Sequence, residues 1–320
     1  MLNLCNANAM NLQERGSGFP GSARLIHSII RALRLHQWSK NALIFVPLVL
    51  GNKLTDAAAW TAAVIGLIAL GFAASATYVV NDLRDTADDR RHRSKRHRPL
   101  ASSALSGRAG ILIASVCFIL GFSLAAMIGT EAVTLLALYV ALSLSYSFCW
   151  KRIPILDVLV LAALLSLRLV VGVLLTDVRL SEWLLIFSMF VFLSLSLAKR
   201  HTEILSAAAA GVAELPGRGY RPADAPFVLA VGTATAVSSI LVMILYLIED
   251  AYPRDFYERP ALLWLIPGLL FLFLGRIWLK CTRGELDDDP VIFALKDRVC
   301  LLLGVLTCLA LAAALRFAPA

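Results

Sequence analysis

Charged side chains are scarce in this sequence and are confined to short stretches between long apolar runs. Asp, Glu, Lys and Arg together make up 16% of the 320 residues, whereas 59% are hydrophobic. Soluble globular domains are usually about 45–50% apolar, and the mean hydropathy here is +0.77. The composition therefore excludes an ordinary soluble domain and predicts a chain embedded in a lipid bilayer.

Cysteine is too scattered to form a zinc site or a disulfide framework. None of the six cysteines belongs to a Cys-x-x-Cys pair, and Cys117, Cys149, Cys300 and Cys308 lie in or beside apolar runs. We expect these four to be small core residues.

The first 21 residues lack a long apolar core. They are polar and carry Gly and Pro, so we expect a disordered extension over 1–21 rather than a cleaved signal peptide. Residues 22–320 are expected to form one membrane-embedded domain.

Nine apolar runs are each near the ~20 residues that a transmembrane helix needs. Because backbone groups inside lipid must be satisfied within the segment, the predicted fold is all-α: a polytopic bundle of about nine transmembrane helices. The first run is short, and Ala23 to Gln37 would extend it as an interfacial segment. The runs are 40–52, 57–81, 109–128, 131–149, 153–175, 182–198, 226–248, 261–279 and 299–317.

Lysine and arginine are distributed unevenly between the two sets of loops. A net charge of +8 is one reason to consider nucleic acid, but basic loops facing the cytoplasm explain it better. Most basic residues precede the first span or follow the second, fourth, sixth and eighth. The opposite loops contain only Lys53, Arg179, Arg254, Arg259 and Arg316. The sequence therefore predicts a multi-pass protein of a bacterial-type inner membrane, with its N-terminus in the cytoplasm.

Acidic residues gather where the second apolar run ends. Asp82, Asp85 and Asp89 are spaced i, i+3 and i+7, which places them on one face if the helix continues past its apolar part. Asn81 lies one turn before Asp85, and Asp88 lies off this face. Mg²⁺ often combines one or two carboxylates with substrate phosphates, so the segment predicts a metal–diphosphate site facing the cytoplasm. A solvated charged loop is the alternative, but it does not explain three acids at helical spacing.

This segment resembles the UbiA superfamily of intramembrane prenyltransferases. The residues that carry the resemblance are Asn81-Asp82-x-x-Asp85-x-x-x-Asp89 and Arg98-Pro99-Leu100-Ala101. It implies nine helices around a central cavity, with Mg²⁺ held by Asn81, Asp82, Asp85 and Asp89 against a substrate diphosphate. One departure concerns the end of the sixth span, where aromatic prenyltransferases carry a second acidic motif. This chain has Lys199 and Arg200 there, with Glu203 as the one carboxylate.

Other stretches are similar to a narrower branch, the decaprenyl-phosphate phosphoribosyltransferases. They are Arg34-Leu-His-Gln37-Trp38-Ser-Lys40-Asn41, Tyr146-Ser-x-x-x-Lys151-x-Ile-Pro154-x-Leu-Asp157, Leu167-Arg168 with Gly172, and Lys199-Arg200-x-x-Glu203 with Arg218-Gly219-Tyr220. This resemblance implies Mg²⁺-dependent transfer of 5-phosphoribose from phosphoribosyl diphosphate to a polyprenyl phosphate, in cell-envelope biosynthesis. Prenyl transfer to an aromatic acceptor is the alternative within the superfamily. A transporter is a third reading, against which the lack of a visible inverted repeat argues. Homo-oligomerisation stays open.

The predicted site combines carboxylates with cytoplasmic cations. We expect Asp82, Asp85, Asp89 and Asp157 to be catalytic, and we expect cations away from the metal to bind a second phosphate. The substrate-binding candidates are Gln37, Lys40, Asn41, Asn81, Arg98, Tyr146, Lys151, Arg168, Lys199, Arg200 and Glu203.

Several of these residues also have a structural interpretation. Lys40, Lys151, Lys199 and Arg200 would serve equally well as snorkelling anchors at helix ends. Gln37 and Asn41 share a helix face at i, i+4, and Glu203 is spaced to pair with Lys199. An ionised residue within a span costs at least ~2.5 kcal/mol on insertion scales and usually faces a partner or a cavity. Asp157 and Arg168 are therefore either an ion pair or substrate contacts.

Overall fold

The computed structural model describes residues 21–91, 95–215, 217–254, 257–286 and 289–315, with the backbone alone described for 21–23 and 91. Residues 1–20 of the expected disordered extension lie outside the described part, whereas its last residue, Gly21, begins a helix. The described residues contain helices, turns and one isolated β-bridge between Tyr257 and Leu315.

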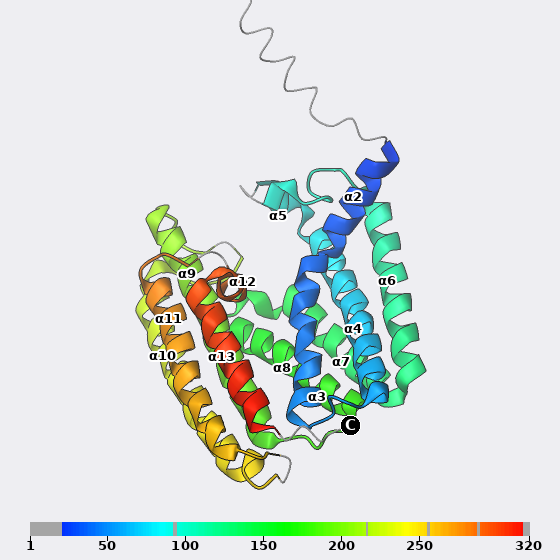
Figure 1. The fold of residues 1–320 in the computed structure, drawn as a ribbon. Coiled ribbons are helices and arrows are strands. Elements are labelled where there is room, and N and C mark those ends of the chain that lie inside the picture. The colour runs from blue at the N-terminus through cyan, green and yellow to red at the C-terminus, as the bar shows by residue number, and fades with distance from the viewer. Residues whose placement is uncertain (1–20, 92–94, 216, 255–256, 287–288, 316–320) are drawn as a thin grey trace, which may run out of the picture. The chain divides into compact units, whose positions relative to one another are not determined.

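Figure 1 shows the helices in chain order. The α-helices are α2 (Gly21–Leu33), α3 (Val46–Leu50), α4 (Ala57–Arg84), α5 (Thr86–Arg91), α6 (Gly107–Ile128), α7 (Thr130–Phe148), α8 (Leu156–Thr176), α9 (Glu182–Ala209), α10 (Ala225–Tyr246), α11 (Leu265–Thr282), α12 (Pro290–Lys296) and α13 (Arg298–Ala314). The short 3₁₀ or π-helical segments are η1 (Leu35–Phe45), η2 (Lys95–His97), η3 (Trp150–Arg152), η4 (Pro222–Asp224), η5 (Leu247–Ala251) and η6 (Pro260–Trp264).

Seven helical segments of the described chain are long and apolar enough to cross a bilayer. The bent pair α12 and α13, whose axes differ by 83°, would be an eighth. The bend falls at Asp297, whose carboxylate accepts hydrogen bonds from the N–H groups of Val299 and Cys300 and so begins α13. The all-α, multi-pass prediction is therefore confirmed, with the number nine approximate.

The first predicted span, 40–52, is not a continuous transmembrane helix. Leu35–Phe45 form a 3₁₀ helix, and α3 adds one short turn before Gly51. A 3₁₀ helix has three residues per turn, so residues four apart lie about 120° apart around its axis. The expectation that Gln37 and Asn41 share one face is therefore wrong.

Two cysteines expected in the core are exposed. Cys117 and Cys300 are buried, but Cys149 and Cys308 are exposed. In a membrane protein the lipid-facing positions of a helix are as apolar as its core positions. Hydropathy therefore could not separate the two classes of cysteine.

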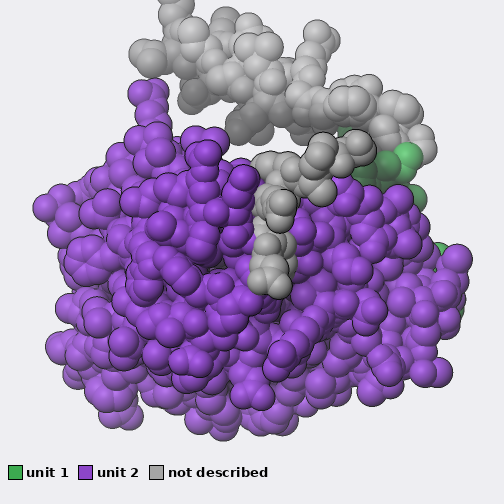
Figure 2. Space-filling view, turned by 60° about the horizontal axis from the view of Figure 1, so that its bottom comes forward, with its two compact units in different colours: residues 1–39, 71–121 green, residues 40–70, 122–320 purple. Residues whose placement is uncertain are grey.

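The chain divides into two compact units, coloured separately in Figure 2. Unit 1 comprises Met1–Ser39 and Gly71–Gly121, and unit 2 comprises Lys40–Leu70 and Phe122–Ala320. The three boundaries fall within η1, α4 and α6, so each of these helices has residues in both units. The prediction of one domain over 22–320 stays a prediction.

The core of unit 1 joins α2 to the end of α4 and the start of α6. Ala32, Val79 and Ala114 come from these three helices and pack in one buried cluster with Leu100 and Leu105 of the connecting loop. That loop is also fixed by hydrogen bonds, including Leu105 N–H to the Pro99 carbonyl at 3.0 Å. The loop after α4 is thus folded against the helices that carry the acidic segment.

Unit 2 is built on packing of α9 against α8 and α10, with α11 beside α10 (Figure 1). Trp278 Nε1 donates to Ser194 Oγ at 2.9 Å, and Ser194 Oγ donates to the Gly232 carbonyl at 2.9 Å. A methyl group at Gly232 would overlap the Trp278 ring. Close packing of three helices therefore depends on this glycine.

Candidate active site

The acidic segment lies where α4 extends beyond its apolar part. Asp85 N–H donates to the Asn81 carbonyl at 2.9 Å, and Asp89 N–H donates to the Asp85 carbonyl at 2.8 Å. Helical hydrogen bonding therefore continues from α4 into α5. Asp82 and Asp89 lie together as their i, i+7 spacing predicts, each 4% exposed, whereas Asp88 is exposed.

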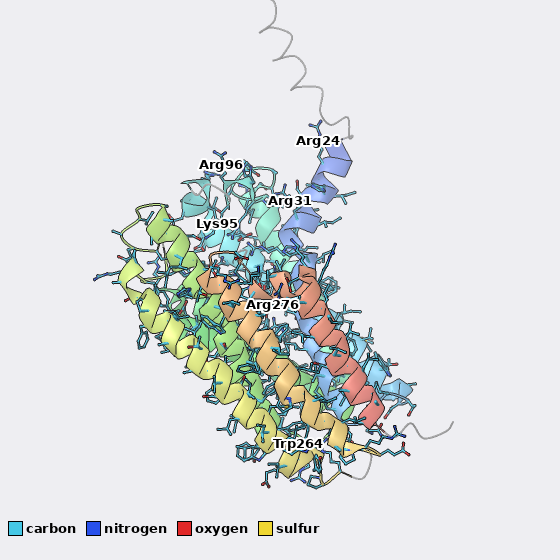
Figure 3. All side chains as sticks on the ribbon, turned by 60° about the vertical axis from the view of Figure 1, so that its left-hand side comes forward. Arg24, Arg31, Lys95, Arg96, Trp264 and Arg276 are labelled. Atoms are coloured by element: carbon cyan, nitrogen blue, oxygen red, sulfur yellow. The ribbon has the colours of Figure 1, made fainter. Side chains whose placement is uncertain are left out.

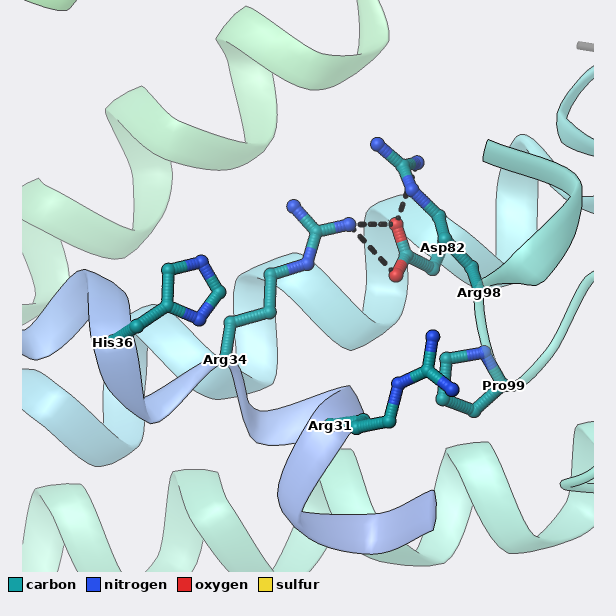
Figure 4. A pocket seen from close by; sticks show the side chains of 6 residues that line it. All are labelled: Arg31, Arg34, His36, Asp82, Arg98 and Pro99. Atoms are coloured by element: carbon teal, nitrogen blue, oxygen red, sulfur yellow. Dashed lines mark hydrogen bonds and ion pairs between the residues drawn. The ribbon is translucent and has the colours of Figure 1, made fainter. Parts of the chain in front are cut away.

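Two arginines bind Asp82 (Figure 4), and one of them also reaches Asp89. Arg34 Nη2 lies 2.6 and 2.8 Å from the two oxygens of Asp82. Arg98 Nη1 lies 3.0 Å from Asp82 Oδ1 and 2.7 Å from Asp89 Oδ2. Arg98 was predicted, but Arg34 was missed, although it begins the stretch 34–41 that carries the resemblance.

The pair Asp82 and Asp89 suits a hard divalent cation. Both side chains offer carboxylate oxygens as metal ligands. One positively charged nitrogen of Arg98 already lies between these oxygens. Mg²⁺ commonly takes one or two carboxylates and completes its shell with water and substrate phosphates. No three His, Cys, Asp or Glu side chains of the described residues gather as a metal site. Ligation by Asn81 and Asp85 therefore stays a prediction.

In unit 2, two predicted phosphate-binding lysines share one carboxylate. Lys40 Nζ and Lys199 Nζ lie 3.4 and 3.5 Å from Asp289 Oδ2. The other oxygen of Asp289 accepts the Val291 N–H at 2.9 Å and caps α12. Asp289 was missed, although an acid followed by Pro290 and an apolar run is a usual signal for a helix start.

This cluster carries a net positive charge. Burial raises the pKa of the Asp289 carboxyl, but Lys40 and Lys199 outweigh it, so the pKa lies below its ordinary value. Burial lowers the pKa of the Lys40 ammonium, and Asp289 offsets only part of that effect. At neutral pH the carboxylate is ionised, so two lysines share one negative charge. The cluster can therefore bind a further anion.

Asn41 and Arg168 meet in the interior of unit 2. Arg168 Nε donates to Asn41 Oδ1 at 3.0 Å, its Nη2 donates to the Tyr139 hydroxyl at 3.2 Å, and its guanidinium lies over the Tyr139 ring. A third bond joins Arg168 to the Leu164 carbonyl. The buried Nδ2 of Asn41 has no hydrogen-bond partner among the described residues, so it offers a donor to a ligand.

Asp157 pairs with Arg200 rather than with Arg168. Asp157 is fully buried and Arg200 is 1% exposed, and 2.7 Å separates Asp157 Oδ2 from Arg200 Nη2. The Tyr220 hydroxyl donates to the other oxygen of Asp157 at 2.7 Å. Burial raises the pKa of Tyr220, which keeps that proton on the hydroxyl. Glu203 also pairs with Arg200, so the alternative pairing of Glu203 with Lys199 is wrong.

Tyr146, Lys151 and Gln37 are the remaining predicted residues. The Tyr146 hydroxyl accepts a hydrogen bond from Arg218, whose guanidinium lies 5.9 Å from the ring centroid. Lys151 is half-buried on η3, and Gln37 is half-buried in unit 1. A substrate role for these three residues stays a prediction.

Fold and site together define a class: a polytopic helical membrane protein with buried carboxylates and excess cations at its polar helix ends. Comparison with known families is more specific. The sequence model of the UbiA prenyltransferase family matches residues 43–296, and the chain belongs to that family. It is therefore a membrane-embedded member of a family of prenyltransferases.

Three known proteins are similar to this chain over most of its length. An uncharacterized protein of Sinorhizobium fredii, y4nM, is 40% identical over 90% of this chain, which spans only 56% of that protein's length. The nodulation protein NoeC of Azorhizobium caulinodans is 31% identical over 83% of this chain and 86% of its own length. The decaprenyl-phosphate phosphoribosyltransferase of Mycobacterium tuberculosis is 26% identical over 92% of this chain and 96% of its own length. The chain thus lies close to the phosphoribosyltransferase branch.

A solved structure agrees with the fold. The UbiA homolog from Archaeoglobus fulgidus bound to GPP and Mg²⁺ superimposes with a TM-score of 0.66, covering 90% of this chain and 98% of that one. Sequence identity is 18%. The similarity therefore establishes a UbiA-type fold.

Proposed function

We propose that this chain transfers 5-phosphoribose from phosphoribosyl diphosphate to a polyprenyl phosphate and releases diphosphate. The observation that carries the proposal is the sharing of Asp289 by Lys40 and Lys199. This cluster includes Lys199, which follows the apolar part of α9, where a prenyltransferase with two metal clusters would need acids. Similarity to the M. tuberculosis decaprenyl-phosphate phosphoribosyltransferase supports the same donor and acceptor.

The diphosphate of the donor is assigned to the acidic segment. Asp82 and Asp89 would hold Mg²⁺, with Asn81 and Asp85 as further ligands, and the bound ion would neutralise charge on the leaving diphosphate. The A. fulgidus homolog bound to GPP and Mg²⁺ supports the use of a divalent metal in this fold. Arg98 pairs with both carboxylates and is the cation next to this diphosphate.

A phosphate group other than the leaving diphosphate is assigned to the lysines of unit 2. Lys40 and Lys199 would bind the 5-phosphate of the donor or the phosphate of the lipid. The Nδ2 donor of Asn41 would bind a ribose hydroxyl, because it is buried and has no partner within the described chain. Arg168 keeps Asn41 in place through the bond at 3.0 Å.

The chemical step needs positioning more than acid–base catalysis. An oxygen of the polyprenyl phosphate attacks C1 of the ribose, and the bond from C1 to the diphosphate oxygen breaks. The acceptor is already an anion, so no strong base is required, and in-line attack predicts inversion at C1. Asp157 and Arg200 neutralise each other within the protein, which favours a positioning role for both.

Prenyl transfer from a polyprenyl diphosphate to an aromatic acceptor is the second candidate, favoured by the family match. A paired assay separates the two candidates. Membranes containing the full chain are given labelled phosphoribosyl diphosphate, Mg²⁺ and a polyprenyl phosphate, and label in the organic phase is measured. A parallel assay supplies a labelled prenyl diphosphate and an aromatic acid.

We expect labelled lipid from the phosphoribosyl donor alone, and its loss with EDTA. Asp82→Asn should reduce turnover at least 100-fold, while Arg108→Gln, which changes an exposed arginine of α6, should not. Product from the prenyl donor alone would overturn the proposal. Full activity of Asp82→Asn would overturn the assignment of the metal site.

A further inference from the structure

Helix α2 carries apolar side chains on two of its faces, and only one of these faces packs inside unit 1. Ala32 belongs to the buried cluster and Ile29 packs against it, whereas Ile26 and Ile30 are 58% and 47% exposed. Ile26, Ile30 and Leu33 are spaced i, i+4 and i+7, so they form a separate stripe along the helix. An exposed apolar stripe of this kind marks a site of contact with a membrane or with another protein.

The third face of α2 is basic. Arg24, His27 and Arg31 are spaced i, i+3 and i+7, and all three are exposed. At about 100° per residue, the centre of this stripe lies about 120° around the helix axis from the centre of the apolar stripe. The sequence of the helix contains no acidic residue. A helix with adjoining apolar and basic faces is typical of helices that lie in a membrane interface.

The 3₁₀ segment η2 extends this basic surface. Arg31 Nη2 donates to the His97 carbonyl at 2.9 Å, so the basic face of α2 meets η2, which consists of Lys95, Arg96 and His97. Figure 3 shows Arg24, Arg31, Lys95 and Arg96 at the same end of the unit. Neither segment contains an acid that would compensate this charge. Each lysine or arginine near a membrane surface adds to the attraction for acidic lipid.

Hydrogen bonds anchor the C-terminal end of α2 to the membrane-spanning helix α4. Ser75 Oγ of α4 donates to the Leu33 carbonyl at 2.7 Å, and Trp38 Nε1 donates to Ser75 Oγ at 3.0 Å. Leu25 lies seven residues before Ala32 on the same face but is 49% exposed, so the first turns of α2 extend past the buried cluster. A bilayer that already holds α4 is within reach of α2 without a separate association step. This favours lipid over a separate protein as the partner of α2.

We propose that α2 is an interfacial helix that binds acidic phospholipids of the leaflet nearest to it. Ile26, Ile30 and Leu33 enter the boundary between headgroups and acyl chains, and Arg24 and Arg31 contact the lipid phosphates. This surface takes a membrane lipid whichever donor the chain uses, so the inference does not rest on the proposed reaction.

Fluorescence quenching of the full chain in nanodiscs tests where the apolar stripe lies. In a cysteine-free background, Ile26→Cys carries an environment-sensitive fluorophore, which is quenched either by brominated lipid or by aqueous iodide. The lipid control is Leu112→Cys on α6, a position that is 66% exposed, and the water control is Ala104→Cys in the exposed loop before α6. We expect the probe on α2 to follow Leu112→Cys, with iodide quenching several-fold weaker than at Ala104→Cys. Ile30→Cys replaces Ile26→Cys if that protein does not fold.

A second measurement tests the preference for acidic lipid. In nanodiscs of phosphatidylcholine with a small share of brominated lipid, brominated phosphatidylglycerol should quench the α2 probe more strongly than brominated phosphatidylcholine. Arg24→Gln combined with Arg31→Gln should bring the ratio of the two close to one, each arginine accounting for up to about fivefold enrichment. Arg179→Gln, which changes an exposed arginine between α8 and α9, should leave the ratio unchanged. High salt should lower the ratio, because it screens exposed charges.

Three outcomes would overturn the proposal. Iodide quenching of the α2 probe equal to that of Ala104→Cys would place the helix in water. Protection from both quenchers would show that protein covers the stripe, such as a second copy of this chain. Equal quenching by the two brominated lipids would show that the helix lies in the membrane without recognising acidic headgroups.

Discussion

At the scale of single residues, Asp157 shows how a buried carboxylate is stabilised inside this protein. Its carboxylate is fully buried and is neutralised by Arg200 of α9 and by the Tyr220 hydroxyl. The same hydroxyl accepts the N–H of Ile155, whose φ of +68° is unusual for a β-branched residue. One tyrosine thus supports both the carboxylate and the strained turn that begins α8.

Removing one partner of this pair should be severely destabilising. Arg200→Met removes the cation that pairs with the buried Asp157 carboxylate, which costs about 3–5 kcal/mol for a buried pair. Thermal unfolding in detergent should show a large drop in midpoint. Adding Asp157→Asn to Arg200→Met should recover part of the loss, because the unpaired charge is gone. A double variant worse than the sum of the single ones would contradict the pairing.

Lys40 should set the alkaline limit of activity. Burial lowers its pKa, so as pH rises its ammonium loses the proton earlier than an exposed lysine would. Phosphate affinity should fall with it, seen as a rise in donor KM on the alkaline side. A guanidinium stays charged up to about pH 12, so Lys40→Arg should move this limit to higher pH. Lys53→Arg is the matched control, and an unmoved limit in Lys40→Arg would contradict the assignment.

At the scale of elements, the approach of η1 to α8 depends on Gly172. A side chain at this position would overlap the carbonyl oxygen of Ile44, and backbone cannot move aside as a flexible side chain can. The contact lies close in sequence to Asn41 on η1 and Arg168 on α8, which are joined by a hydrogen bond. Packing of these two elements therefore sets the position of the Asn41 amide.

Gly172→Ala should consequently weaken both stability and substrate binding. Overpacking of this kind costs about 1–3 kcal/mol, and displacement of η1 should raise donor KM as well. Gly275→Ala in α11 is the control, because nothing lies within 4 Å of the added methyl; alanine there should be neutral or slightly stabilising. Equal unfolding midpoints for the two variants would contradict the close approach.

At the scale of the whole molecule, basic residues gather at particular helix ends, and this pattern predicts the orientation of the chain in the membrane. Arg24 and Arg31 of α2 and Lys95 and Arg96 of η2 lie at one end of unit 1 (Figure 3). In unit 2, Trp264 precedes α11 and Arg276 lies near the opposite end of that helix (Figure 3). Tryptophan is frequent at membrane interfaces, and cytoplasmic loops carry an excess of lysine and arginine.

The predicted orientation can be measured by cysteine labelling. In a cysteine-free background, Ala104→Cys lies before α6 and Arg179→Cys lies between α8 and α9, both at exposed positions. An impermeant maleimide added to spheroplasts should label Arg179→Cys and should reach Ala104→Cys only after permeabilisation. The reverse pattern would show that the acidic segment faces away from the cytoplasm.

Prediction from sequence succeeded where a local rule applies. The long helices α4 and α6 to α11 follow from apolar length, because lipid requires each span to satisfy its own backbone. The common face of Asp82 and Asp89 follows from helical spacing. The first span was wrong, because an apolar run does not distinguish an α-helix from the 3₁₀ segment Leu35–Phe45 followed by a short turn.

The sequence by itself determined the membrane fold, the family and the acidic segment. Each depends on residues that are close together in the chain, through apolar length, motif residues and helical spacing. Only the tertiary structure decided which charges meet. Arg34 reaches Asp82 across 48 residues, Arg200 rather than Arg168 pairs with Asp157, and Asp289 joins Lys40 to Lys199. Such pairs depend on how helices pack, and a buried charge takes whichever opposite charge the packing brings within reach.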